Sequence, residues 1–248
     1  MNLQIYTIEP NKQKNEGIIS KGDIKMKNRT ESKIENLKGL MNVIDTNSKH
    51  GIMTDQYGIK HNAFEITDLV GTCHVYVPDC GFYFSMSNSG KRFIRKCRNT
   101  AYERYLRSDM WVHTGTDIKS VKYYMQDVVA VMYYRDKLNK LIAEHQNIVV
   151  NHKDYDVTNN KPENIEVVTN RQNILHGMIV KALQYHYGDK YFKTYADGSI
   201  SPALKVAISA EDIEAAYDRL YRPRMIHTEY GRRYSLETVN ALIEMLGL

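Results

Sequence analysis

The order of apolar and polar residues over 148–183 predicts a strand, a loop, a second strand and a helix. A short apolar run ends at Asn151 and His152, which stand at the end of the first strand. A polar loop follows over 153–163, and a second short strand returns over 165–168. The polar pair at the end of the first strand makes this unit the most informative part of the chain.

The helix of this unit is expected to begin near Thr169 or Asn170, because either side chain can accept a hydrogen bond from the first free N–H groups of a helix. Apolar residues then recur at helical spacing, and they are Ile174, Leu175, Met178, Ile179, Ala182 and Leu183. At about 100° per residue, Asn173 and His176 lie roughly opposite this stripe and within about 60° of each other. Both side chains are therefore expected to be free to face a ligand.

The polar residues of this unit stand at fixed spacing. They are Asn151-His152, Asn159-Asn160, Asn164-Ile165-Glu166 and Asn173. The pattern resembles that of the HNH (ββα-metal) nucleases, and among them the phage and intron-associated HNH homing endonucleases. The resemblance implies a metal-dependent enzyme that hydrolyses DNA phosphodiester bonds, with its motif over 148–176.

The resemblance also implies a role for each matching residue. His152 would be the general base that takes a proton from the attacking water, which suits an imidazole whose ordinary pKa is about 6.5. Asn151 and Asn173 would give oxygen ligands to one divalent ion, and such ligands beside a phosphate favour Mg²⁺ or Mn²⁺. Asn164 would hold the loop across the two strands. His176 is either an additional or alternative ligand, or part of a solvated helix surface.

Two positions depart from the family's pattern. Asn151 replaces an Asp that is common in close relatives, so the site has one fewer negative charge and is expected to bind metal weakly until a DNA phosphate joins it. Tyr155 stands where the loop often has Gly, and its side chain is hard to place if the backbone needs a positive φ. The pair 159–160 is interpreted as turn residues, and Glu166 as a strand residue that faces water.

Charge agrees with a nucleic-acid partner, since the formal net charge of the chain is +5. The cations cluster: Lys91, Arg92, Arg95, Lys96, Arg98, Arg104 and Arg107 follow one another closely. Such a cluster predicts phosphate contacts to double-stranded DNA. The alternative is a solvated basic face without a partner.

Other features limit the cofactors and the location. The three cysteines, Cys73, Cys80 and Cys97, form no Cys-x-x-Cys pair, which argues against a structural zinc site. No apolar run approaches the roughly 20 residues that span a bilayer, and the N-terminus lacks the form of a signal peptide. We expect a cytoplasmic protein, in the cytoplasm of a host cell if a phage encodes it, with no membrane partner.

Three zones predict an α+β fold. Residues 1–65 are polar and are expected to be a loosely ordered or accessory segment. Residues 66–184 are expected to form the HNH nuclease domain, in which a small antiparallel sheet and a helix precede the ββα core. The helix stripe before the core consists of Val121, Tyr124, Met125, Val128, Met132, Leu138, Leu141 and Ile142.

Residues 185–248 are expected to form a hairpin and a helical module. Asp197-Gly198 suits a tight hairpin turn, and Ser209 and Ser235 can each cap a helix. The module either reads DNA by placing one helix in a major groove or packs onto the nuclease domain.

The sequence therefore predicts a homing-type DNA endonuclease, expected to be a monomer that nicks one strand. A nonspecific nuclease is the nearest enzyme alternative, and it would show greater salt sensitivity without a preferred cut position. The alternative from another class is a DNA-binding protein that keeps the HNH fold and has lost catalysis.

Overall fold

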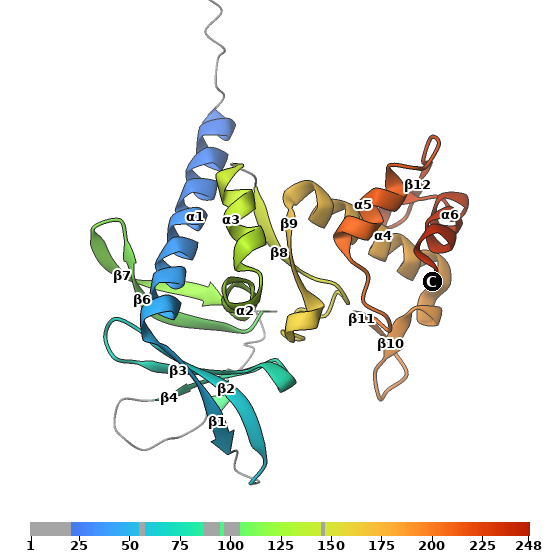
Figure 1. Ribbon diagram of the computed structural model, residues 1–248. Helices are drawn as coiled ribbons and strands as arrows, with labels where there is room; N and C mark the ends of the chain where they lie inside the picture. The colour runs from blue at the N-terminus through green and yellow to red at the C-terminus, as the bar shows by residue number, and fades with distance from the viewer. Residues whose placement is uncertain (1–20, 55–57, 87–94, 97–104, 145–146) are drawn as a thin grey trace, which may run out of the picture.

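The computed structural model describes residues 21–54, 58–86, 95–96, 105–144 and 147–248, and within these ranges the fold is α+β (Figure 1). The helices are α1 (Lys21–Asn47), α2 (Met125–Tyr133), α3 (Arg135–Ala143), α4 (Asn170–Tyr187), α5 (Ala210–Tyr217) and α6 (Leu236–Leu246). The strands are β1 (Ser48–Thr54), β2 (Lys60–Thr67), β3 (Cys73–Val77), β4 (Phe82–Met86), β5 (Arg95–Lys96), β6 (Arg107–Thr114), β7 (Asp117–Tyr124), β8 (Ile148–His152), β9 (Ile165–Thr169), β10 (Phe192–Thr194), β11 (Ile200–Leu204), β12 (Met225–Thr228) and β13 (Gly231–Tyr234). Short 3-10 turns lie at η1 (Pro78–Cys80), η2 (Pro162–Asn164) and η3 (Gly188–Lys190).

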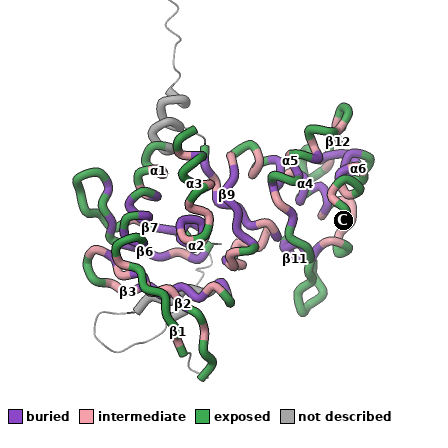
Figure 2. Tube along the Cα trace, in the orientation of Figure 1, coloured by how far each residue is buried: buried purple, intermediate pink, exposed green. Residues whose placement is uncertain are grey.

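The N-terminal lobe joins an antiparallel sheet, ordered β1-β2-β3-β4-β5, to the β6–β7 hairpin and helices α1 to α3. Helix α1 lies against β6, where a Cβ on Gly39 would come within 2.5 Å of the carbonyl oxygen of His113. The helix places Leu37, Leu40, Met41, Val43 and Ile44 in the same core as β6, α2, β8 and β9 (Figure 2). The described part of 1–65 is therefore an integral part of this lobe and not the accessory segment that its polar composition suggests.

The segment before the motif also differs from the expected single helix. Val121 and Tyr124 lie in strand β7, and the helix begins only at Met125. The reason is visible in β6, where Ser108, Met110, Val112 and Thr114 are buried and their neighbours are not, which is the period of a half-buried strand. A second helix, α3, follows the bend at Tyr134.

Helix α4 links the lobes. It begins after Thr169, whose hydroxyl accepts a hydrogen bond from Gln172 N while the Gln172 side chain returns to Thr169 N, as in a capping box. Its apolar stripe packs into a second core with α5, α6 and β10, so a domain boundary at 184 falls inside the helix. The expected strand–loop–strand–helix unit is thus formed by β8, β9 and α4, with β8 and β9 antiparallel.

The C-terminal module contains the three features that its turn and cap residues predict. The Asp197-Gly198 turn joins β10 to β11, and Ser209 and Ser235 cap α5 and α6. The β12–β13 hairpin was not expected from the sequence. Among the described residues, no helix is both long and apolar enough to cross a membrane.

Candidate functional site

A cleft of about 950 Å³ lies beside the β8–β9–α4 unit. Asn151 and His152 reach it from the end of β8, and Asn173 reaches it from the first turns of α4. Tyr105 lines it from the N-terminal lobe, and Ser201 from β11. The structure therefore brings together three of the residues that the sequence singles out.

The His152 ring is held by Asn160. Its Nε2 lies 3.1 Å from Asn160 Oδ1, and the other amide atom of Asn160 donates to Thr158 O. Because an amide oxygen only accepts, Nε2 carries the ring proton, and Nδ1 is the nitrogen that can accept one. Burial lowers the pKa of His152, opposed by Asn160 and by the nearby Asp154 and Asp156. His152 is therefore neutral and oriented at neutral pH.

Asn160 is a site residue that the sequence analysis interpreted as a turn residue. It is 1 % exposed, and the Tyr76 hydroxyl of β3 donates to its carbonyl oxygen at 2.8 Å. Gly81 also approaches this loop, where an added Cβ would lie 2.9 Å from Lys161 N. The N-terminal sheet thus supports the residue that orients His152. The feature of the sequence that could have identified Asn160 is the pair of adjacent asparagines that it forms with Asn159.

Asn164 braces the loop between the two strands. Its Oδ1 accepts from Asp154 N at 3.0 Å, and its Nδ2 donates to Asp154 Oδ1 and Asn159 O, both at 2.8 Å. Asp154 is buried and also accepts from Asn159 Nδ2 at 2.7 Å. This is the supporting arrangement that the sequence led us to expect of Asn164, and it acts through Asp154, which the sequence analysis did not single out.

The backbone at Tyr155 has φ 63°, so this position does require the left-handed conformation in which a Gly is usual. The Tyr155 ring packs edge-on against His176, with 5.9 Å between ring centroids. This contact offsets part of the conformational cost, which is about 1–2 kcal/mol for a non-glycine residue.

Asn151 makes two hydrogen bonds through one atom. Its Nδ2 donates to Glu166 Oε1 at 2.7 Å and lies 3.1 Å from His176 Nδ1. Glu166 is 7 % exposed and also accepts from Ser209 Oγ at 3.0 Å and Ala210 N at 2.9 Å. The expectation that Glu166 faces water is therefore wrong. The signal for its burial was its place between the apolar residues Ile165 and Val167 of the strand.

His176 does not face the open side of α4. It is 0 % exposed, because the Tyr155 ring packs against it and the backbone of Ile208, from the C-terminal module, lies beside it. Burial lowers the pKa of His176 to about 4, opposed by the nearby backbone of Lys153 and the charge of Asp154. The orientation expected from helical spacing is wrong for His176, and its Nδ1 faces Asn151 instead of the cleft.

The oxygen donors of the cleft fit a hard divalent cation. Glu166 attracts the amide hydrogens of Asn151, so Oδ1 is the atom of this side chain that remains for a ligand. Asn173 lines the same cleft with a second amide oxygen. Within the described ranges, no group of three or more His, Cys, Asp and Glu side chains could hold a metal, so a bound ion would depend on neutral amide oxygens and on its substrate.

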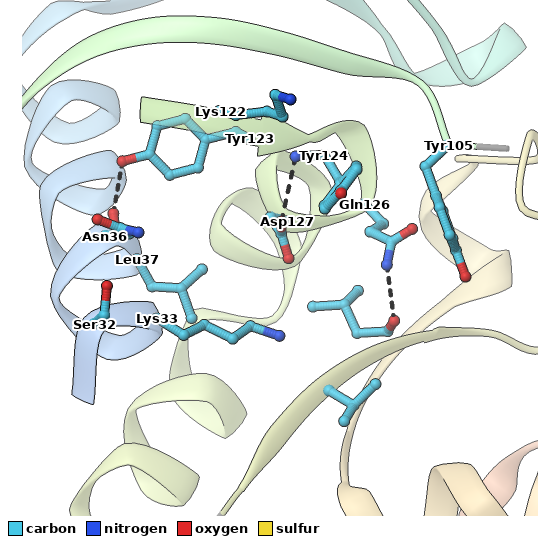
Figure 3. A pocket seen from close by; sticks show the side chains of 12 residues that line it. Ser32, Lys33, Asn36, Leu37, Tyr105, Lys122, Tyr123, Tyr124, Gln126 and Asp127 are labelled. Atoms are coloured by element: carbon cyan, nitrogen blue, oxygen red, sulfur yellow. Dashed lines mark hydrogen bonds between the residues drawn. The ribbon is translucent and has the colours of Figure 1, made fainter. Parts of the chain in front are cut away.

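A second pocket of about 400 Å³ borders the cleft and shares Tyr105, Gln126, Val149 and Val150 with it (Figure 3). Lys33 and Lys122 also line this pocket. The Lys33 ammonium donates to Ile148 O at 3.0 Å, and the Gln126 side chain donates to Val150 O at 3.0 Å. Both pockets border β8. The second pocket adds aromatic and cationic side chains beside the cleft that contains His152.

The structure describes only part of the predicted basic cluster. Lys91, Arg92, Arg98 and Arg104 lie outside the described residues. Arg95 and Lys96 form β5, which pairs with β4. Arg107 is the first residue of β6. The structure thus locates three of these seven residues, two of them at the edge of the N-terminal sheet.

Asp68, His74 and Ser108 have the residue types of a hydrolase triad but not its setting. Ser108 Oγ lies 3.1 Å from His74 Nδ1, and His74 Nε2 lies 3.4 Å from Asp68 Oδ2. All three are buried, and none lines the cleft or its neighbouring pocket. Asp68 also accepts from Trp111 N, so the group ties β3 and the β2–β3 turn to β6.

Comparisons with protein-family models, with curated proteins and with solved structures gave no match.

Proposed function

We propose that this protein is a metal-dependent DNA endonuclease of the HNH type. The observation that carries the proposal is the position of His152, neutral and oriented by Asn160, in one cleft with Asn151 and Asn173. The strand–loop–strand–helix unit that holds these residues agrees with the motif resemblance.

His152 supplies the general base in this proposal. A base must be unprotonated and must have an accepting atom within reach of its substrate. The lowered pKa of His152 meets the first condition near pH 7, and Nδ1, which no described residue hydrogen-bonds, meets the second. Asn160 holds the ring through Nε2 and favours the imidazolium once the proton from water has been taken.

Asn151 and Asn173 are the residues that would hold Mg²⁺ or Mn²⁺. A bound divalent ion supplies charge stabilisation at the scissile phosphate and at the leaving oxygen. Both ligands are neutral, so the DNA phosphate is the main negative charge available to the ion, and binding of metal and of DNA should depend on each other.

The C-terminal module supports DNA as the substrate, though not through its helices. Neither α5 nor α6 contains Lys or Arg, and both contain Glu. The cations lie instead on and beside the β12–β13 hairpin, at Arg222, Arg224, Arg232 and Arg233. None of these four forms an ion pair with a residue that the structure describes, so their charge is available to a polyanion. We propose that this hairpin, and not a helix, contacts the DNA backbone.

A catalytically silent DNA-binding protein is the second candidate. It is favoured by the neutral metal ligands, since neither Asn151 nor Asn173 brings a charge to the ion. Cleavage and binding must therefore be measured separately.

The first experiment is the conversion of supercoiled plasmid to nicked and linear forms, with Mg²⁺ or Mn²⁺, by the wild-type protein and by His152→Ala. A positioned general base contributes about 10²- to 10⁴-fold, so cleavage by the variant should be nearly lost while its DNA affinity stays unchanged. His113→Ala is a matched control, because His113 is exposed on β6 and lies outside the cleft. Equal cutting by wild type and His152→Ala would refute the proposed base, and DNA binding without any cutting would favour the silent protein.

A further inference from the structure

The environment of Asn151 has a feature that the proposed metal site does not explain by itself. An amide NH₂ group has two hydrogens, and both are engaged: one points to Glu166 Oε1 and the other to His176 Nδ1. Both partners are buried, at 7 % and 0 % exposure. The amide is therefore held on one side only, through its nitrogen, and its oxygen is directed away from both partners.

We infer that Glu166 and His176 are positioning residues that fix the Asn151 amide with Oδ1 turned toward the cleft. An unrestrained Asn can exchange the places of its oxygen and nitrogen by rotation of its terminal torsion. Here that rotation would place the amide oxygen against the carboxylate of Glu166, acceptor against acceptor. The inference rests on the proposed function, because a ligating role for Asn151 Oδ1 is what gives the orientation a purpose.

The two partners impose complementary requirements. The Asn151 amide donates, so His176 Nδ1 has to accept, which only a neutral ring can do. Glu166 must accept because three donors converge on it: Asn151 Nδ2, Ser209 Oγ and Ala210 N.

The same contacts explain why an Asn stands at 151, where the HNH pattern that the sequence resembles often has an Asp. A carboxylate at 151 would face the Glu166 carboxylate across the 2.7 Å now spanned by a hydrogen bond. The negative charge therefore lies on Glu166, which contacts Asn151 from the side away from the cleft. Glu166 also accepts a hydrogen bond from the backbone N–H of Ala210, the first residue of α5. Glu166 thereby links the docking of the C-terminal module to the orientation of the ligand.

The test uses Mn²⁺ binding in a background that does not cut. In the His152→Ala protein with duplex DNA, free Mn²⁺ is measured from its electron paramagnetic resonance signal. Loss of a residue that orients a ligand typically weakens metal binding by about 10- to 100-fold, and we expect this for Glu166→Ala. Glu166→Gln should remain within about 3-fold, because its amide oxygen can still accept from Asn151 while its NH₂ donates to Ser209.

Ser209→Ala is the matched control. It removes another contact of Glu166 and weakens the cap of α5, yet leaves the Asn151 contact intact. If Ser209→Ala and Glu166→Ala weaken Mn²⁺ binding equally, or if Glu166→Ala leaves it unchanged, the positioning role is refuted. If the parent protein binds no Mn²⁺ on DNA, the proposed metal site itself fails.

A second measurement decides the orientation without metal or DNA. In the metal-free protein, the side-chain amide of Asn151, identified by its absence in Asn151→Ser, should exchange its hydrogens slowly in a ¹⁵N spectrum. Glu166→Ala should lose this protection, and Glu166→Gln should keep it. Fast exchange in the wild-type protein would overturn the inference whatever the enzyme does.

Discussion

The substitution Asn151→Asp is the most direct test of the buried contact between Asn151 and Glu166. In the wild-type protein, Asn151 Nδ2 lies 2.7 Å from Glu166 Oε1, and both residues are 7 % exposed. The substitution keeps the shape of the side chain and changes a donor into a carboxylate. It therefore places two negative charges in contact in a buried environment, and we expect the metal-free variant to be less stable than wild type near pH 8.

The size of the loss follows from Coulomb's law. At a separation of about 3 Å and an effective dielectric constant of about 20, two unit charges repel by about 5.5 kcal/mol. The folded protein relieves this repulsion by retaining one proton between the two carboxylates, so the pKa of the pair rises. Because this repulsion penalises only the doubly charged form, it holds the pKa of the pair well above the ordinary range of a carboxyl group.

The sign of the pH dependence is then determined. Between about pH 4 and pH 8 the folded variant binds more protons than the unfolded chain, so its free energy of unfolding falls as the pH rises. At the acid end of this window the carboxyl group introduced at position 151 is protonated, donates to Glu166 and costs little. At pH 8 the variant should have lost about 5.5 kcal/mol relative to wild type.

Urea unfolding of metal-free protein across this pH range, followed by circular dichroism, measures the effect. Asn164→Asp is the matched control, because Asn164 Nδ2 lies 2.8 Å from Asp154 Oδ1 but Asn164 does not line the cleft. Both variants should lose stability at pH 8, and Mn²⁺ should restore it only in Asn151→Asp. A pH-independent Asn151→Asp protein as stable as wild type would refute the contact with Glu166, and equal rescue of both variants would refute the placement of the metal ligand.

Three further predictions concern the base, the DNA surface and the loop. Asn160→Asp should raise the pKa of His152, because a carboxylate then accepts from Nε2, so the acid limb of the pH–rate profile should move to higher pH; an unmoved limb would contradict the contact. Alanine at both arginines of β13 should reduce the slope of log affinity against log salt by about 2 and leave kcat at saturating DNA unchanged; an unaltered slope would remove the hairpin from the DNA surface. Gly81→Ala, with φ 65° and a Cβ 2.9 Å from Lys161 N, should cost at least about 3 kcal/mol in urea unfolding and slow cleavage. Gly198→Ala, with φ 83° and nothing within 4 Å, should cost only about 1–2 kcal/mol, and equal losses would contradict the close approach at Gly81.

The local sequence was sufficient to predict those elements whose conformation depends on only a few adjacent residues. The caps at Thr169, Ser209 and Ser235 and the hairpin turn at Gly198 each depend on a few adjacent residues, and the structure contains them. The strand–loop–strand–helix order over the motif is another such case, since the apolar spacing changes from that of a strand to that of a helix.

The pattern was misleading where distant segments decide burial. The polar composition of the N-terminal zone concealed the apolar side of α1, which becomes visible only when β6 and α2 pack on it. The apolar positions between Val121 and Met132 fit a helix, yet β7 takes the first of them because β6 offers a paired edge. Helical spacing placed His176 opposite the apolar stripe of α4, but it could not show that this face of the helix is covered by other parts of the protein.

By itself, the sequence determined the α+β class, the motif unit and the candidate base, because these depend on local periodicity and on residue chemistry at fixed spacing. Only the tertiary structure decided how the site is held. Asn160 reaches His152, and Glu166 and His176 meet Asn151, because the β8–β9 hairpin and α4 fold back on the loop, while the C-terminal module closes over them. The physical reason is that a buried polar group is satisfied by whichever partner the fold brings near, and that partner is not encoded in its neighbours along the chain.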